Sequence, residues 1–273
     1  MIVRSVAKDF EGIPISLPII DSQRQIADFL DGQVTRLDRA IATRDRQVAL
    51  VNERSQAELA RLYDWTAKGA SRTRLQDLLA QPPCYGVLVP ELVDEGVPFI
   101  RINDLFRVDA GSPPLASIPA RQSLEYRRTI VAPGDVLTAV VGTLGRSAIV
   151  QDGQAGANIA RAVCRLQPKS NVDPWFIRAW LDTPQFRQAA ELATGSGTAQ
   201  ATLNMGDLAK FPILSPYNGT SRVASEAREV LAETAAKVRL MQESADLLAE
   251  RKQALITAAV TGQFDVSTAR GAA

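Results

Sequence analysis

Two long stretches of the chain, residues 21–68 and 218–264, place apolar side chains at alternating steps of four and three residues. Seven of ten such seam positions are apolar in the first stretch, from Leu30 to Leu62, and eight of ten in the second, from Ala227 to Ala259. This spacing is the heptad pattern of helices that pack along a shared seam. The first helix would be roughly 70 Å long, so it needs a partner along its length. The pattern predicts two long helices that pack on each other, with Lys252 of the second facing Glu53 or Glu58 of the first.

Between these helices, residues 69–217 lose the heptads, and Gly and Pro punctuate short β-prone runs. Asp173-Pro174 opens a helical pair that breaks at Thr183-Pro184, where proline suits the first turn of a new helix. Strands are expected over 97–102, 135–141, 147–150 and 159–166, and turns over 133–135, 142–145 and 152–153. This block is a mixed α/β domain of ordinary size. The fold class is therefore α+β, with one mixed domain flanked by two long helices that form an antiparallel coiled coil.

The lead-in to each long helix repeats along the sequence. Ile13-Pro14-Ile15 and Pro18 recur 198 residues later as Phe211-Pro212-Ile213 and Pro216. The repeating unit is an exit from a domain, a Pro-spaced link and a long helix. Residues 1–20 therefore resemble the tail of an upstream domain plus its link, and an ordinary disordered N-terminus is the alternative. Residues 265–273 are expected to be a flexible tail.

The charge balance gives no sign of a polyanion partner, because 31 Lys and Arg face 30 Asp and Glu. The chain has no histidine, which excludes Ser-His-Asp and Cys-His catalysis and His-containing zinc sites. The two cysteines, Cys84 and Cys164, are far apart in sequence and are expected to be reduced. We therefore predict no catalytic residues, no metal site and no cofactor.

No stretch approaches the length of apolar sequence that spans a bilayer, and the start of the chain lacks the apolar run of a signal peptide. The sequence therefore predicts a cytoplasmic protein with no membrane partner.

Several segments together resemble the specificity (S) subunit of type I restriction-modification systems. They are the helix entry PISLPIIDSQRQIADFLD with TRLDRAI beyond it, the C-terminal ERKQALITAAVTGQ, the segments VPFIRINDL and PGDVLTAVVGTLGRSAIV, the loop and exit GSGTAQATLNMGDLAKFPI, and the paired helices before that loop. The resemblance covers nearly the whole chain beyond residue 12. Each segment alone is a loose match, and the combination is specific.

The resemblance implies a non-enzymatic subunit that reads double-stranded DNA. In this family two target recognition domains each read half of a bipartite site, and two conserved antiparallel helices separate them. Methyltransferase (modification) subunits and a restriction translocase subunit dock around the S subunit. This sequence departs from the pattern because it holds one recognition domain, residues 69–217, so it resembles a truncated or split form. Self-association, or pairing with a second half specificity subunit, would restore two domains.

DNA reading needs side chains that reach base edges: Arg for guanine, Asn or Gln for adenine, and Ser or Thr for either. Within the mixed domain these types gather in loops and at strand ends, and surface ion pairing or solvation is the alternative for each; Arg101, for example, could pair with Asp104. The candidates are Tyr85, Gly86, Arg101, Asn103, Thr143, Arg146, Asn158, Arg161, Ser196, Thr198 and Gln200.

Two further functions compete with DNA recognition. The chain could be a coiled-coil assembly fragment from a split or truncated specificity gene, which binds partner subunits without reading DNA. It could also be an enzyme with an unusual site that lacks histidine. The sequence favours a DNA-recognition subunit, with methyl transfer and cleavage on its partners.

Overall fold

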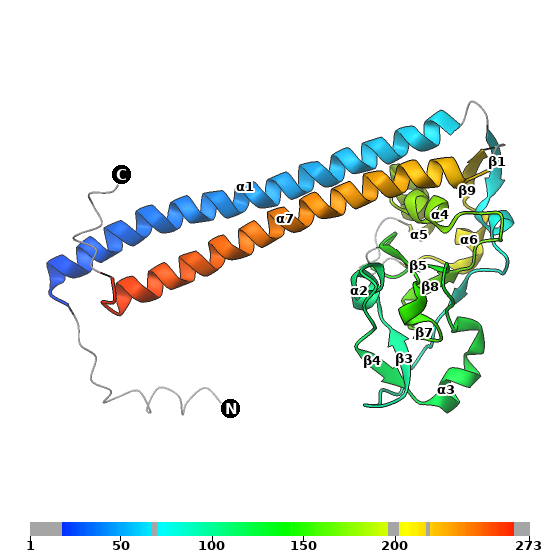
Figure 1. The fold of residues 1–273 in the computed structure, drawn as a ribbon, viewed down its shortest axis with the longest axis horizontal. Coiled ribbons are helices and arrows are strands. Elements are labelled where there is room, and N and C mark those ends of the chain that lie inside the picture. The colour runs from blue at the N-terminus through cyan, green and yellow to red at the C-terminus, as the bar shows by residue number, and fades with distance from the viewer. Residues whose placement is uncertain (1–17, 67–69, 143, 196–201, 217–218, 265–273) are drawn as a thin grey trace. The chain divides into compact units, whose positions relative to one another are not determined.

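The computed structural model describes residues 18–66, 70–142, 144–195, 202–216 and 219–264 (Figure 1). The chain divides into two compact units: a helical unit, residues 1–49 with 238–273, and a mixed unit, residues 50–237. The two long helices, α1 (Ile20–Thr66) and α7 (Ser221–Val260), contribute residues to both units. Within the described ranges, no helix combines the length and the apolar character that a membrane span requires.

The helical unit is an antiparallel pair of helices, as predicted (Figure 1). Residue numbers rise along one helix while they fall along the other. The Phe29 and Phe264 ring centroids lie 5.6 Å apart, and Arg44 Nε donates to Ser244 Oγ at 3.2 Å. Every predicted seam position of this unit is half-buried or buried. These positions are Leu30, Val34, Leu37, Ile41, Arg44 and Val48 on α1, and Val238, Met241, Ala245, Leu248, Lys252, Leu255 and Ala259 on α7.

The predicted partner of Lys252 is wrong. Lys252 Nζ lies 2.8 Å from Asp38 Oδ1, because the antiparallel register sets position 252 opposite position 38. Glu58 instead pairs with Arg54 of its own helix at 2.7 Å. The heptad pattern locates the seam on each helix, but it leaves the register between the helices open.

Within its described residues, the mixed unit holds three small sheets. Their strand orders are β1-β9, β2-β8-β5-β6 and β4-β3-β7; all neighbours are antiparallel except β3 and β7, which are parallel. The strands are β1 (Ala70–Arg74), β2 (Cys84–Tyr85), β3 (Val97–Ile100), β4 (Ala116–Ile118), β5 (Val136–Ala139), β6 (Ser147–Ile149), β7 (Asn158–Ile159), β8 (Val163–Leu166) and β9 (Pro212–Pro216).

Helices join and cover these strands. The α-helices are α2 (Leu105–Asp109), α3 (Ala120–Glu125), α4 (Pro174–Leu181), α5 (Pro184–Thr194) and α6 (Met205–Lys210), and the 3-10 helices are η3 (Leu75–Leu78), η4 (Ile102–Asp104), η5 (Arg127–Thr129) and η6 (Asp152–Gln154). The α4–α5 pair begins and breaks as predicted. The Asp173 side chain caps α4 through Trp175 N, and the Thr183 side chain caps α5 through Phe186 N.

The strand predictions hold for β3, β5 and β6, but the expected strand 159–166 is two strands. Ile159, together with the preceding Asn158, pairs with β3 as β7, and Val163–Leu166 pair with β5 as β8. The chain changes sheets between them, where Ala160 N donates to Ile100 O and Arg161 N to Val87 O. The Pro-spaced segment before α7 also forms a strand, β9, which pairs with β1. The expected turn at 152–153 is the 3-10 helix η6.

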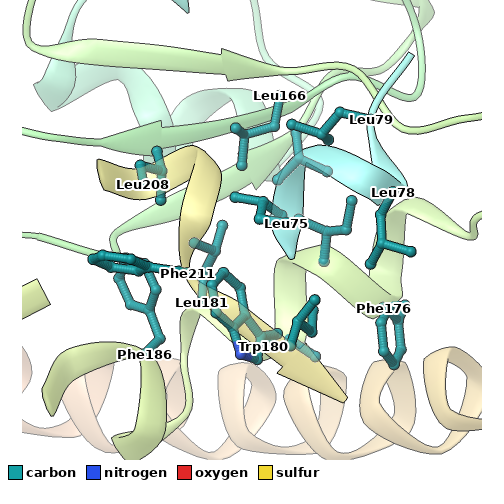
Figure 2. Close-up of a cluster of buried hydrophobic side chains, with 14 of the residues drawn as sticks. Leu75, Leu78, Leu79, Leu166, Phe176, Trp180, Leu181, Phe186, Leu208 and Phe211 are labelled. Carbon is teal, nitrogen blue, oxygen red and sulfur yellow. The ribbon is translucent and has the colours of Figure 1, made fainter. Parts of the chain in front are cut away.

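The main core of the mixed unit joins the long helices to the sheets (Figure 2). Leu59 and Tyr63 of α1 and Ala227 of α7 are buried with α4 and α5 residues. The Tyr63 hydroxyl donates to the Phe176 carbonyl. The Trp180 and Phe186 rings meet edge to face with their centroids 5.1 Å apart. The ends of α1 and α7 that belong to this unit are therefore part of its core.

We expect Phe186→Ala to lower the free energy of unfolding by about 3–5 kcal/mol, because it empties a fully buried aromatic site in this core. Urea denaturation followed by circular dichroism measures the loss. Leu192→Ala on the same helix is the matched control: its side chain is 79% exposed, so the loss should stay within about 0.5 kcal/mol. Equal losses would contradict the packing described here.

Candidate nucleic-acid interface

Two predicted DNA contacts, Tyr85 and Arg161, line one hollow of about 210 Å³. Leu88, Val141 and Thr202 complete its lining. The Tyr85 hydroxyl donates to Leu203 O at 3.3 Å, and the Arg161 backbone N–H donates to Val87 O at 3.0 Å. The Arg161 residue is exposed, and its guanidinium makes no ion pair among the described residues. The hollow therefore combines apolar walls with one available cation and two hydroxyl-bearing residues, Tyr85 and Thr202.

A bridge between distant segments forms one wall of this hollow. Val141 pairs antiparallel with Thr202, and Leu203 N donates to Val140 O at 2.8 Å. Four predicted contacts, Thr143, Ser196, Thr198 and Gln200, lie outside the described residues. They belong to the two sequence segments that adjoin this bridge, after Val141 and before Thr202.

The structure corrects the prediction for two other residues, Gly86 and Asn158, because both are buried. The Asn158 side chain is fully buried, and its Nδ2 donates to Thr129 Oγ1 at 2.9 Å and to Tyr126 O at 3.3 Å. At Gly86 a Cβ atom would fall 1.8 Å from Ile159 O, so this backbone passes too close for any side chain. Both residues pack the domain interior, and neither presents a side chain to a base edge.

Arg101 and Asn103 lie at the end of β3. Arg101 Nε pairs with Asp104 Oδ2 at 3.2 Å, and the same oxygen accepts from the Arg101 backbone N–H at 3.0 Å. This is the ion pair that the sequence left open as the alternative role of Arg101. Asn103 is exposed. Neither residue lines the hollow of Tyr85 and Arg161.

Arg146 lines a larger hollow of about 570 Å³. Arg178 of α4 and Arg187 of α5 share this lining, and the sequence interpretation had left both unassigned. Both lie in the helical pair that the sequence does predict. Their spacing of nine residues crosses the break between α4 and α5, so no helical periodicity in the sequence shows that they face one space.

Neither cysteine is an activated nucleophile. Burial raises the pKa of the Cys84 thiol, and it raises the pKa of the Cys164 thiol well above its usual range. The neutral thiol therefore dominates at neutral pH, whereas nucleophilic chemistry needs the thiolate. Among the residues described, no three Cys, Asp or Glu side chains gather closely enough to hold a metal ion.

Comparison with known proteins identifies the relatives of this chain. No family model matches it. Over 194 residues it is 30% identical to the type I restriction enzyme EcoBI specificity subunit of Escherichia coli, a match that spans 68% of this chain and 37% of that protein. The chain is a relative of type I specificity subunits.

Solved structures of type I systems share the fold. A chain from a study of complex assembly and conformational transition of the type I R-M system has a TM-score of 0.64 at 20% identity, covering 89% of this chain and 60% of that one. The HsdS subunit from Thermoanaerobacter tengcongensis has a TM-score of 0.52 at 20% identity, with coverages of 91% and 60%. The S subunit from M. genitalium has a TM-score of 0.52 at 11% identity, with coverages of 89% and 61%.

These matches confirm the predicted family and the mixed fold with long helices. This chain spans 37% of the length of the curated relative and 60–61% of the length of the solved chains that it matches. The match in sequence and the match in fold therefore concern a part of each relative.

We expect Gly86→Ala to destabilise the mixed unit strongly, by more than about 2 kcal/mol, because the new methyl group would collide with backbone rather than with a movable side chain. Gly32→Ala in α1 is the matched control. It has no atom within 4 Å of its added Cβ, so it should stabilise the helix by up to about 1 kcal/mol. Chemical denaturation of both variants measures the difference. A stable Gly86→Ala variant would refute the close backbone approach.

Proposed function

We propose that this chain is the DNA sequence-recognition subunit of a type I restriction-modification system, that it reads one half-site, and that it docks methyltransferase subunits. The observation that carries the proposal is the hollow of Tyr85 and Arg161, in a chain related to specificity subunits. The chemistry of methyl transfer and cleavage would reside on partner subunits, including a restriction translocase in the full complex. A subunit of such a system that reads DNA would work in the cytoplasm.

The hollow suits the edge of a base pair in the major groove. An arginine guanidinium donates two parallel hydrogen bonds to guanine O6 and N7, and apolar walls accept a thymine methyl group. Arg161 supplies the guanidinium, and Leu88 and Val141 supply apolar surface. The backbone bond from Arg161 N to Val87 O fixes the position of its Cα, so little backbone freedom would be lost on binding.

The predicted contacts at Thr143, Ser196, Thr198 and Gln200 stay part of this proposal. They fall in segments that adjoin the Val141–Thr202 bridge, and Val141 and Thr202 line the hollow. Small polar side chains beside a fixed arginine are the groups that adaptable base reading requires. Arg101 and Asn103 are weaker candidates, because Arg101 is held by Asp104.

The charge balance suggests that partners strengthen DNA binding. A net charge of +1 gives the chain almost no long-range attraction for a polyanion. Phosphate contacts supply most of the affinity of DNA-binding proteins. Methyltransferase subunits that dock on this chain would supply many of those contacts, as would a second copy or a second half specificity subunit.

An apolar stripe on α7 within the helical unit is our proposed methyltransferase dock. Leu240 and Leu247 are 63% and 65% exposed, one heptad apart and off the seam, and Ala254 continues the line. Side chains seven residues apart lie on one face of a helix. A partner helix with its own apolar face could cover this stripe and form a third helix of the bundle.

Arg161→Ala should weaken binding to the selected half-site by roughly 5- to 150-fold, the equivalent of about 1–3 kcal/mol for a lost bidentate contact. The measurement is fluorescence anisotropy with the chain bound to its modification subunit, on sites selected from a randomised library. Arg127→Ala, an exposed arginine outside the hollow, is the control and should keep the selected sequence. A wild-type complex that selects no sequence would favour the assembly-fragment alternative.

Leu240→Asp with Leu247→Asp should weaken modification-subunit binding at least tenfold in calorimetry, because a docked stripe would bury two carboxylates without partners. Gln253→Asp is the control: it adds a charge at an exposed position of the same helix outside the stripe. The thermal unfolding midpoint of the free chain should change little in both variants. Unchanged affinity in the double variant would exclude this stripe as the dock.

A further inference from the structure

We infer that the larger hollow of the mixed unit binds a phosphate group. Three arginines from three elements line it: Arg146 after the β5–β6 turn, Arg178 on α4 and Arg187 on α5. Guanidinium groups recognise phosphate oxygens through paired charge-assisted hydrogen bonds. The phosphate could come from a DNA backbone or from a free phosphate compound, since both present the same oxygen atoms. Only the DNA source rests on the function proposed above.

The turn that precedes Arg146 is held firmly against the α4–α5 pair. A Cβ atom at Gly145 would lie 2.9 Å from Leu181 O and 3.0 Å from a ring carbon of Phe186, so the turn and the helices are in close contact there. Gly145 has a φ of +83°, which glycine adopts without strain. The next residue, Arg146, is fixed by a backbone hydrogen bond, in which Ala139 N donates to Arg146 O at 2.7 Å. The backbones that carry the three arginines are thus set relative to one another.

Arg178 is the inner cation of the hollow. Its side chain is 11% exposed, and it pairs with Asp182 and, at 3.5 Å, with Asp109. Its Nε atom is buried and has no hydrogen-bond partner in the described parts of the chain. Ser147 also lines the hollow and is 6% exposed. Its buried Oγ atom likewise has no hydrogen-bond partner among the described residues. Arg178 therefore brings a buried positive charge to the wall of the hollow, and part of the hydrogen-bonding capacity of this wall is unused.

The outer cations remain available to a ligand. Arg146 and Arg187 are exposed, and neither forms a salt bridge within the described ranges. The one carboxylate in the lining, Asp182, is already engaged by Arg178. Burial raises the pKa of Asp182, whereas Arg178 and Arg187 act to lower it, which indicates that Arg187 lies near this carboxylate.

Neutral donors from α1 also belong to the lining. Asn52 and Gln56 lie one helical turn apart and contribute amide groups, which can donate to phosphate oxygens beside the guanidinium groups. The hollow has a volume of about 570 Å³, which leaves room for a sugar attached to the phosphate. A phosphodiester and a phosphate monoester therefore both fit the chemistry of the lining.

The first experiment uses the full chain and inorganic phosphate. Isothermal titration calorimetry should give saturable phosphate binding to the wild-type chain at fixed ionic strength, and at least tenfold weaker binding to the double variant Arg146→Gln with Arg187→Gln. The control Arg127→Gln, at an exposed arginine outside the hollow, should bind as the wild type does. Circular dichroism checks that each variant is folded. No saturable binding to the wild type, or equal binding to a folded double variant, would overturn the inference.

The second experiment identifies the source of the phosphate. It measures how DNA affinity falls with salt for the complex with the modification subunit. If the hollow holds a DNA phosphate, the double variant should lose about one unit of the slope of log K against log salt for each contact removed. An unchanged slope together with lost phosphate binding would point to a free phosphate compound. A wild-type complex that binds no DNA would refute the proposed function and leave the calorimetric result standing.

Discussion

The pairing of β1 with β9 is the constraint on which the arrangement of the mixed unit depends. β1 comes four residues after the end of α1, and β9 ends five residues before α7 begins. Their antiparallel register, from Ala70 opposite Pro216 to Arg74 opposite Pro212, brings the entrance and the exit of the domain together. The last turns of α1 and the first turns of α7 must then lie beside each other and run in opposite directions. Leu59, Tyr63 and Ala227 are buried in the main core as a result.

The two hollows are linked by a short piece of chain. Val141 lines the hollow of Tyr85 and Arg161, and Leu144 to Ser147 line the hollow of the three arginines. A single β5–β6 connection thus touches both proposed ligand sites. A base contact and a phosphate contact could be coordinated through it without any movement of the sheets, because its ends are held by β5 and β6.

Local sequence patterns predicted the elements whose burial repeats regularly along the chain. The seam of each long helix and the starting points of α4 and α5 depend on neighbours a few residues away, so they could be predicted. The pairing of β1 with β9 and the split of β7 from β8 depend on partners far along the chain, which local patterns do not specify. The same dependence on distant partners explains why some site residues were wrongly predicted or missed. Asn158 and Gly86 have the residue types of a reading loop, but their burial is set by Thr129 and Ile159 from other segments. Arg187 was missed because its place in the lining of the larger hollow depends on the packing of the β5–β6 turn against α5.

The β1–β9 pair also bears on how such a domain could be exchanged in evolution. A segment whose two ends are adjacent can be replaced as a cassette without altering the host on either side. Residues 70–216 meet that condition. The limit on exchange is the shared core, since a new cassette must offer apolar surface that accommodates Leu59 and Tyr63. Recombination would therefore tolerate wide variation over the reading surface, while the patch that faces these two side chains would be kept.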